Sequence, residues 1–206
     1  LGLFLISTLT VVMSILLSGS MVHKELERKT IYTILSKPIH RYEFLLGKYL
    51  GNVLTSGVMV GVLGTLLGGC LVFVGGEVTP TYLYAIWFIW VEVMIVTAVS
   101  LFFISFSSPI LSGSLAIGVF ITGRFVPTLL AFKFEESAAE LQLLEDFVHI
   151  FARVVPDLSL FNLTPNLVYD MPTSFAFVQD ATLSGFAYVG LCLCLASVFF
   201  GRRDLT

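Results

Sequence analysis

The side chains best suited to bind a partner gather in one stretch, residues 23–48, between two long apolar runs. Six of the eleven Lys and Arg residues lie there, interleaved with acidic ones: Lys24, Arg28, Lys29, Lys37, Arg41 and Lys48 beside Glu25, Glu27 and Glu43. A purely basic stretch would indicate binding to anionic lipid headgroups. The mixed signs favour docking of a protein partner instead.

Residues Ser36-Lys37-Pro38 break this stretch into two short helices, because proline lacks an amide donor and disfavours a helical conformation in the residue before it. Apolar residues lie among the charges of the first helix, at Leu26, Ile31, Ile34 and Leu35. A solvated loop is the alternative, but it would not need this apolar run. The pattern predicts a short amphipathic docking helix.

Two further ionisable residues, Glu92 and Arg124, lie inside apolar runs. Ionisable groups at membrane depth are rare, and they pair with each other or face a cavity. At a rise of 1.5 Å per residue, we place Glu92 roughly 15 Å and Arg124 roughly 10 Å from the same membrane boundary. They form an ion pair or line one polar pocket, or else Arg124 extends to the headgroups alone.

No residues with the types and spacing of a catalytic site are recognisable. The three His residues have no Ser, Cys or carboxylate partner at a recognisable spacing, namely His23, His40 and His149. No Gly-rich phosphate-binding loop is present. Three Cys residues fit apolar packing better than a metal site or a redox pair: Cys70, Cys192 and Cys194. We expect no enzymatic activity, no metal site and no cofactor bound directly.

The elements that position these residues are membrane-spanning helices. The chain has 206 residues, of which 57% are hydrophobic and 12% charged, and its mean hydropathy is +0.96. Continuous apolar runs exceed the roughly 20 residues that cross a bilayer, and a barrel would show short alternating segments instead. We predict an all-α polytopic bundle forming one domain over residues 1–206, with five visible spans: 1–22, 49–74, 82–106, 109–131 and 183–200.

The first residue, Leu1, already lies within an apolar run, so we expect an upstream sixth helix that this sequence lacks. The charged residues of segment 132–181 are mainly acidic, whereas the basic residues Arg202 and Arg203 follow the last span. The positive-inside rule then places residues 23–48 and the C-terminus in the cytoplasm and residues 132–181 outside. Within that outer segment, apolar residues recur at helical spacing over 144–155, which predicts an external amphipathic helix.

Four glycines recur at positions i, i+4, i+7 and i+11 of the second span: Gly57, Gly61, Gly64 and Gly68. Such a glycine stripe lets another helix approach closely. Without that contact, each glycine would only weaken the helix, by up to about 1 kcal/mol relative to Ala. We expect packing within the subunit, with a dimer seam as the alternative.

The mixed-charge stretch contains Glu25, Glu27, Arg28, Lys29, Thr30 and Ile31, followed by Leu35-Ser36-Lys37-Pro38-Ile39 and Arg41. This segment resembles the cytoplasmic signature of type-2 ABC transporter permeases. Residues 156–162 and the ending at 199–205 are similar to other parts of that family, especially its branch linked to multicopper-enzyme maturation. Lys29 stands where many relatives have Gly.

The resemblance implies the permease subunit of an ATP-binding-cassette exporter in the inner membrane. Residues 23–48 would form the coupling helix that docks on a cytoplasmic ATPase subunit, which binds ATP and Mg²⁺. Two permease chains would pair through the first and fourth visible spans, with seam contacts at Leu16, Ile15 and Phe120. The other expected partners are the lipid bilayer and an extracytoplasmic protein. We expect no binding of nucleic acid. The alternative function is an envelope-assembly or mechanotransmitting subunit that translocates no substrate.

Overall fold

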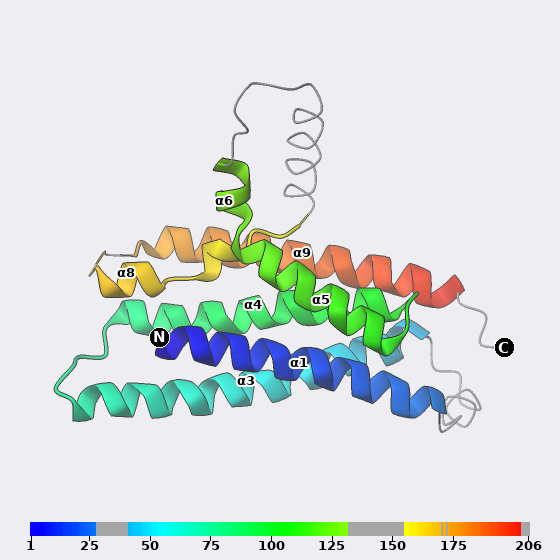
Figure 1. Cartoon of the computed structure of the whole chain (residues 1–206), viewed down its shortest axis with the longest axis horizontal. Coiled ribbons are helices and arrows are strands. Elements are labelled where there is room, and N and C mark those ends of the chain that lie inside the picture. The colour runs from blue at the N-terminus through cyan, green and yellow to red at the C-terminus, as the bar shows by residue number, and fades with distance from the viewer. Residues whose placement is uncertain (28–40, 132–154, 170, 172, 203–206) are drawn as a thin grey trace.

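The computed structural model describes residues 1–27, 41–131, 155–169, 171 and 173–202, and these residues form helices, turns and connections without a strand. Five longer helices lie side by side along the molecule (Figure 1): α1 (Gly2–Glu27), α3 (Arg41–Phe73), α4 (Pro80–Ile104), α5 (Pro109–Arg124) and α9 (Phe175–Arg202). Three short helices follow α5 in the chain: α6 (Val126–Ala131), the 3-10 helix η1 (Leu158–Phe161) and α8 (Thr164–Val168). The prediction of an all-α polytopic bundle is confirmed.

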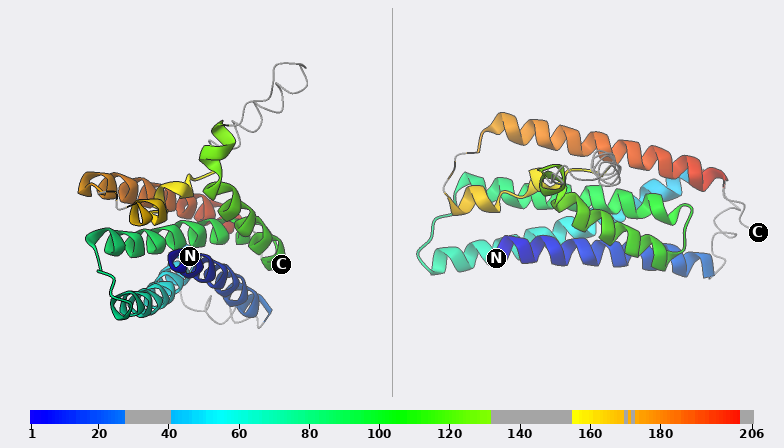
Figure 2. Two further views of the ribbon diagram at one scale, coloured as in Figure 1. Left: turned by 60° about the vertical axis from the view of Figure 1, so that its left-hand side comes forward. Right: turned by 45° about the horizontal axis from the view of Figure 1, so that its top comes forward.

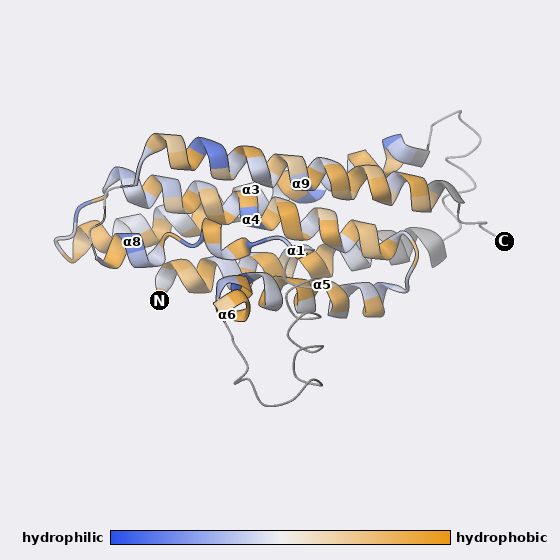
Figure 3. Ribbon diagram, turned by 90° about the horizontal axis from the view of Figure 1, so that it is seen from above, coloured by the Kyte–Doolittle hydropathy of each residue, from blue (hydrophilic) through white to orange (hydrophobic). Residues whose placement is uncertain are grey.

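Helix α4 is the centre of the bundle. It contacts α1, α3, α5 and α9, and every residue from Val91 to Leu101 is buried. Figure 2 shows α4 between α9 on one side and the pair α1 and α3 on the other. A helix without a polar face is expected at such a position, since no side of it gains from exposure. The surrounding helices are also mainly apolar in sequence (Figure 3), and many of their large apolar side chains are exposed.

Among the described residues, four helical stretches are long and apolar enough to cross a membrane: Gly2–Ser20, Tyr42–Phe73, Pro80–Ile104 and Phe175–Phe200. The predicted single helix over 109–131 is wrong. Helix α5 has 16 residues and ends at Arg124, and α6 then projects away from the bundle (Figure 1). The physical reason is Pro127, which has no amide donor and whose ring clashes with the carbonyl four residues earlier.

Other boundaries also differ from the prediction. The last span begins at Phe175 rather than at residue 183. Its first turns accommodate polar residues, since Gln179 and Asp180 are exposed and Thr182 accepts a hydrogen bond from Trp87. Helices α4 and α5 each begin with a proline at the position where the missing amide would be unpaired anyway. The turn between α3 and α4 contains Gly75 with φ of 85°, a conformation that glycine adopts without strain.

Candidate functional site: a buried ion pair inside the helix bundle

Glu92 of α4 and Arg124 at the end of α5 form an ion pair inside the bundle. Arg124 Nε donates to Glu92 Oε1 at 2.9 Å, and a terminal guanidinium nitrogen, Nη2, donates to Glu92 Oε2 at 3.0 Å. The side chains are 1% exposed for Glu92 and 13% for Arg124. This two-bond fork is the strongest geometry available to an arginine and a carboxylate. Arg124 therefore does not extend alone to the headgroups.

Ser7 of α1 completes the site and was not expected from the sequence. Its Oγ donates to Glu92 Oε2 at 2.6 Å, and it accepts from Arg124 Nη2 at 2.6 Å. Three helices thus contribute one side chain each. Burying a charge is unfavourable unless it is paired and its remaining lone pairs are hydrogen-bonded. Both oxygens of the Glu92 carboxylate meet that condition.

Aromatic rings and a connecting segment enclose the ion pair. The Arg124 guanidinium lies 5.3 Å from the ring centre of Phe4 and 5.0 Å from that of Phe120, distances typical of cation–π contacts. Phe161, Asn162 and neighbouring residues after η1 line the remaining space of about 10 Å³. That is about the volume one water molecule needs. This space is too small for a substrate, and the side chains around it are occupied by one another.

A second buried polar cluster lies further along the same helices. Ser14 Oγ is 2.6 Å from Thr97 Oγ1, and Asn52 Nδ2 of α3 donates to the Ser14 carbonyl at 3.0 Å and to Ser18 Oγ at 2.6 Å. Four buried polar residues of α1 share one face, at spacings of three and four: Ser7, Thr10, Ser14 and Ser18. Their periodicity in an apolar helix is the signal that sequence reasoning missed.

The predicted docking residues lie at one end of the bundle or outside the described residues. Glu25 and Glu27 belong to the last turns of α1, and Arg41 begins α3. Arg28, Lys29, Thr30, Ile31 and Lys37 lie outside the described residues. The end of α9 reaches the same place, where the rings of Phe44 and Phe200 stack at 6.3 Å, so the end of α1, the start of α3 and the end of α9 lie together at one end of the bundle (Figure 1).

Three glycines of the stripe contact α4 within this chain. A Cβ added at Gly57 would lie 2.8 Å from Trp90 Nε1, and one at Gly64 would lie 3.0 Å from Ile86 Cδ1. Gly68 faces Tyr82 at ordinary contact distance, whereas Gly61 has no such neighbour within 4 Å. The predicted external helix lies outside the described residues.

The predicted seam contacts are wrong for two of the three residues. Ile15 and Phe120 are buried within this chain, at 2% and 6% exposure, whereas Leu16 is 60% exposed. Ile15 faces α5 rather than a second copy, since a Cβ added at Gly113 would lie 3.7 Å from its Cγ2. The apolar pattern of α1 alone could not tell which face packs internally.

A bundle of this kind, with a largely buried central helix, apolar outer faces and an enclosed ion pair, defines a multi-pass membrane protein. Residues 4–205 match the family model described as ABC-2 family transporter protein. The chain belongs to this family and is a permease subunit of an ABC transporter. The match includes the mixed-charge segment and both ion-pair residues. A comparison with curated protein sequences gives no significant match.

Proposed function

We propose that this permease couples ATP hydrolysis by a separate cytoplasmic ATPase to the export of a substrate, or to extraction of that substrate from the membrane. Membership of the ABC-2 family supports an ATPase partner. The observation that carries the coupling role is the arrangement of the two helices that segment 28–40 connects in the chain. The segment joins the end of α1 to the start of α3, and both helices pack on the central helix α4. A displacement of that segment would therefore act directly on two membrane helices.

The buried polar contacts support transmission of such a displacement. α1 is tied to α4 through Ser7 and Ser14 and to α3 through Asn52. Packed helices with enclosed polar contacts move as units, because leaving a buried donor or acceptor without a partner is unfavourable. In this proposal α1 and α3 move together. The end carrying segment 28–40 faces the cytoplasm of the inner membrane, and two permease chains meet two ATPase subunits that hold ATP and Mg²⁺.

Reversing two charges tests the docking role. We expect Glu27→Lys combined with Arg28→Glu to lower ATP hydrolysis by the complex in liposomes to the rate of the isolated ATPase, because mixed-sign docking depends on both charges. The thermal unfolding midpoint of the purified permease should stay unchanged. Co-purification with the ATPase, measured in parallel, separates lost docking from lost coupling.

The matched control is Glu77→Lys. Glu77 is exposed in the α3–α4 turn, at the end of the bundle away from segment 28–40 (Figure 1), so its reversal should leave hydrolysis unchanged. Full ATPase stimulation in the double variant would contradict the proposal.

A further inference from the structure

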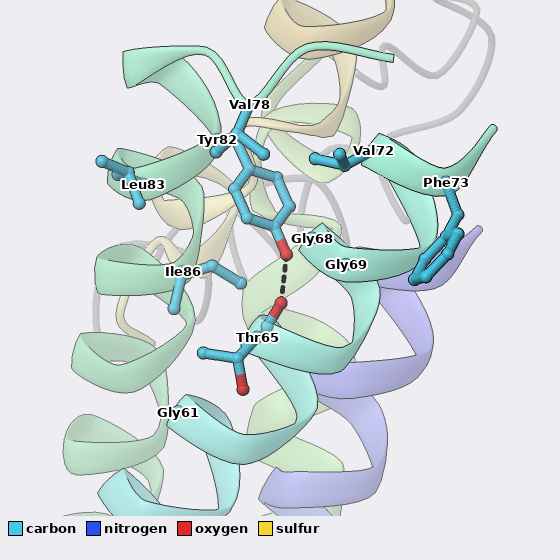
Figure 4. A pocket seen from close by; sticks show the side chains of 11 residues that line it. Gly61, Thr65, Gly68, Gly69, Val72, Phe73, Val78, Tyr82, Leu83 and Ile86 are labelled. Atoms are coloured by element: carbon cyan, nitrogen blue, oxygen red, sulfur yellow. Dashed lines mark hydrogen bonds between the residues drawn. The ribbon is translucent and has the colours of Figure 1, made fainter. Parts of the chain in front are cut away.

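A groove lies between α3 and α4 in the half of the bundle that ends at the α3–α4 turn. Its volume is about 730 Å³. Figure 4 shows Tyr82 reaching across from α4 to the α3 backbone, with Val72 and Phe73 on one side and Leu83 and Ile86 on the other. The space in the groove remains open because Gly61, Gly68 and Gly69 line it and have no side chains to fill it. None of its lining residues lines the ion-pair site.

The walls of this groove offer an occupant no unused polar side chain. Tyr82 donates its hydroxyl to the Gly64 carbonyl at 2.5 Å, and Thr65 donates its own to the Val62 carbonyl at 2.9 Å. No charged side chain is among the lining residues. A polar ligand would lose its hydration without gaining partners, so the occupant is apolar.

The length of the groove identifies the kind of apolar occupant. Gly61 to Phe73 spans about 18 Å of helix at 1.5 Å per residue, close to half of a hydrocarbon core of about 30 Å. Lys48 is the last charged residue of α3, and the groove occupies the far half of the apolar stretch that follows it. The groove therefore extends from near the bilayer midplane to one boundary, across one lipid leaflet.

The groove stops near the midplane because α4 closes it there. The space beside Gly57 is filled by Trp90, whose Nε1 would lie 2.8 Å from an added Cβ, and this nitrogen donates to the Val53 carbonyl at 3.2 Å. A transmembrane helix of a second subunit needs a path along the full span and has a diameter of about 10–12 Å. A groove of one leaflet does not provide that path.

We propose that this groove binds one acyl chain of a bilayer lipid from the leaflet at the α3–α4 turn. The opening is flanked by exposed aliphatic side chains, Val72 and Leu83, over which a lipid enters from the surrounding hydrocarbon. The chain lies along Gly61, Gly68 and Gly69, against the Tyr82 ring and Ile86. This inference does not depend on coupling to an ATPase.

Photochemical labelling tests the proposal. The purified protein is placed in nanodiscs of phosphatidylcholine that contains a diazirine in one acyl chain, illuminated, digested and mapped by mass spectrometry. We expect labelling of Val72, Tyr82 and Ile86 in excess over exposed residues on the outer face of α3, such as Leu54 and Val58. Equal labelling of both sets would overturn the proposal, because it would indicate only the general lipid surroundings.

Three glycine variants sharpen the test. Gly61→Leu and Gly69→Leu place a side chain in open space, since no atom outside the local backbone lies within 4 Å of either added Cβ, so each should fill the groove and abolish the excess labelling. Gly51→Leu is the matched control, as Gly51 has equally open surroundings on the same helix but does not line the groove. Unchanged unfolding midpoints show that all three variants fold.

Two results would overturn the proposal after folding is verified. One is excess labelling that persists in both groove-filling variants. The other is a disulfide crosslink between two copies through cysteines placed at Gly61, which would assign the groove to a protein neighbour.

Discussion

At the scale of single residues, the enclosed carboxylate of Glu92 is stable because its hydrogen-bond donors come from two other helices. Arg124 supplies two donors from α5, and Ser7 supplies one from α1. Breaking a buried pair by removing one partner destabilises a protein by about 3–5 kcal/mol, whereas replacing both partners is often nearly neutral. The network thus makes a specific prediction for single and double variants.

We expect Arg124→Gln to lower the free energy of unfolding by about 3–5 kcal/mol, because it leaves a buried carboxylate without its cation. Glu92→Gln should also destabilise, and the double variant should destabilise less than Arg124→Gln alone. Unfolding in mixed micelles, followed by circular dichroism, measures all three.

Two hydroxyl variants extend this cycle: Ser7→Ala tests the third member of the site, and Thr8→Val is the control. Ser7→Ala removes hydrogen bonds to the pair and should destabilise by about 1–3 kcal/mol. Thr8→Val should be neutral or stabilising, since Thr8 Oγ1 is buried without a hydrogen-bond partner in the described part of the chain. Additive effects of the Glu92 and Arg124 variants would show that the two side chains do not interact.

At the scale of elements, the end of α5 fixes both the ion pair and the segment that covers it. A Cβ added at Gly123 would lie 2.8 Å from Leu158 Cγ and 2.8 Å from the Pro156 carbonyl oxygen. Leu158 is fully buried there, and Phe161 packs edge-on against Phe88 of α4, with ring centres 5.5 Å apart. The absence of a side chain at Gly123 lets η1 dock beside Arg124.

We expect Gly123→Ala to destabilise the bundle by about 1–3 kcal/mol, because the added methyl group has to displace backbone as well as side-chain atoms. Gly118→Ala is the control on the same helix, since no such neighbour lies within 4 Å of its added Cβ. That variant should be neutral or stabilising by up to about 1 kcal/mol through helix propensity. The thermal unfolding midpoints of the two variants test this prediction. Equal midpoints would contradict tight docking of η1.

At the scale of the whole molecule, α1 presents one apolar face to its surroundings and another to α4. Four large side chains are exposed on the outer face: Leu5, Leu9, Met13 and Leu16. Closed two-fold assembly is the commonest arrangement of identical subunits. If two copies pair through α1, this face, and not the one containing Ile15, forms the seam.

Single cysteines introduced on a background without Cys70, Cys192 and Cys194 test that arrangement in membranes. We expect Leu9→Cys or Leu16→Cys to form a disulfide between copies on oxidation, because both positions are exposed. Ile15→Cys is the matched control and should not react, since Ile15 is 2% exposed. Crosslinks found only with cysteines on the exposed face of α3 would place the seam elsewhere.

The sequence by itself determined the membrane class and the all-helical fold, because an apolar run of about 20 residues has few other stable environments. The sequence also indicated a polar site at Glu92 and Arg124, since ionisable side chains are rare at membrane depth. Pro127 already contained the information that α5 ends early, although the continuous apolar pattern obscured it. The docking segment around Arg28 stays a prediction.

Only the tertiary structure decided which face of each outer helix is buried and which residues join the ion pair. Nothing in the composition of α1 distinguishes Ile15, which is buried, from Leu16, which is exposed. Ser7 lies 85 residues from Glu92 in the chain, and their contact depends on the relative depth and rotation of two helices. Those quantities are set by side-chain packing among all the helices at once, which local sequence patterns do not contain.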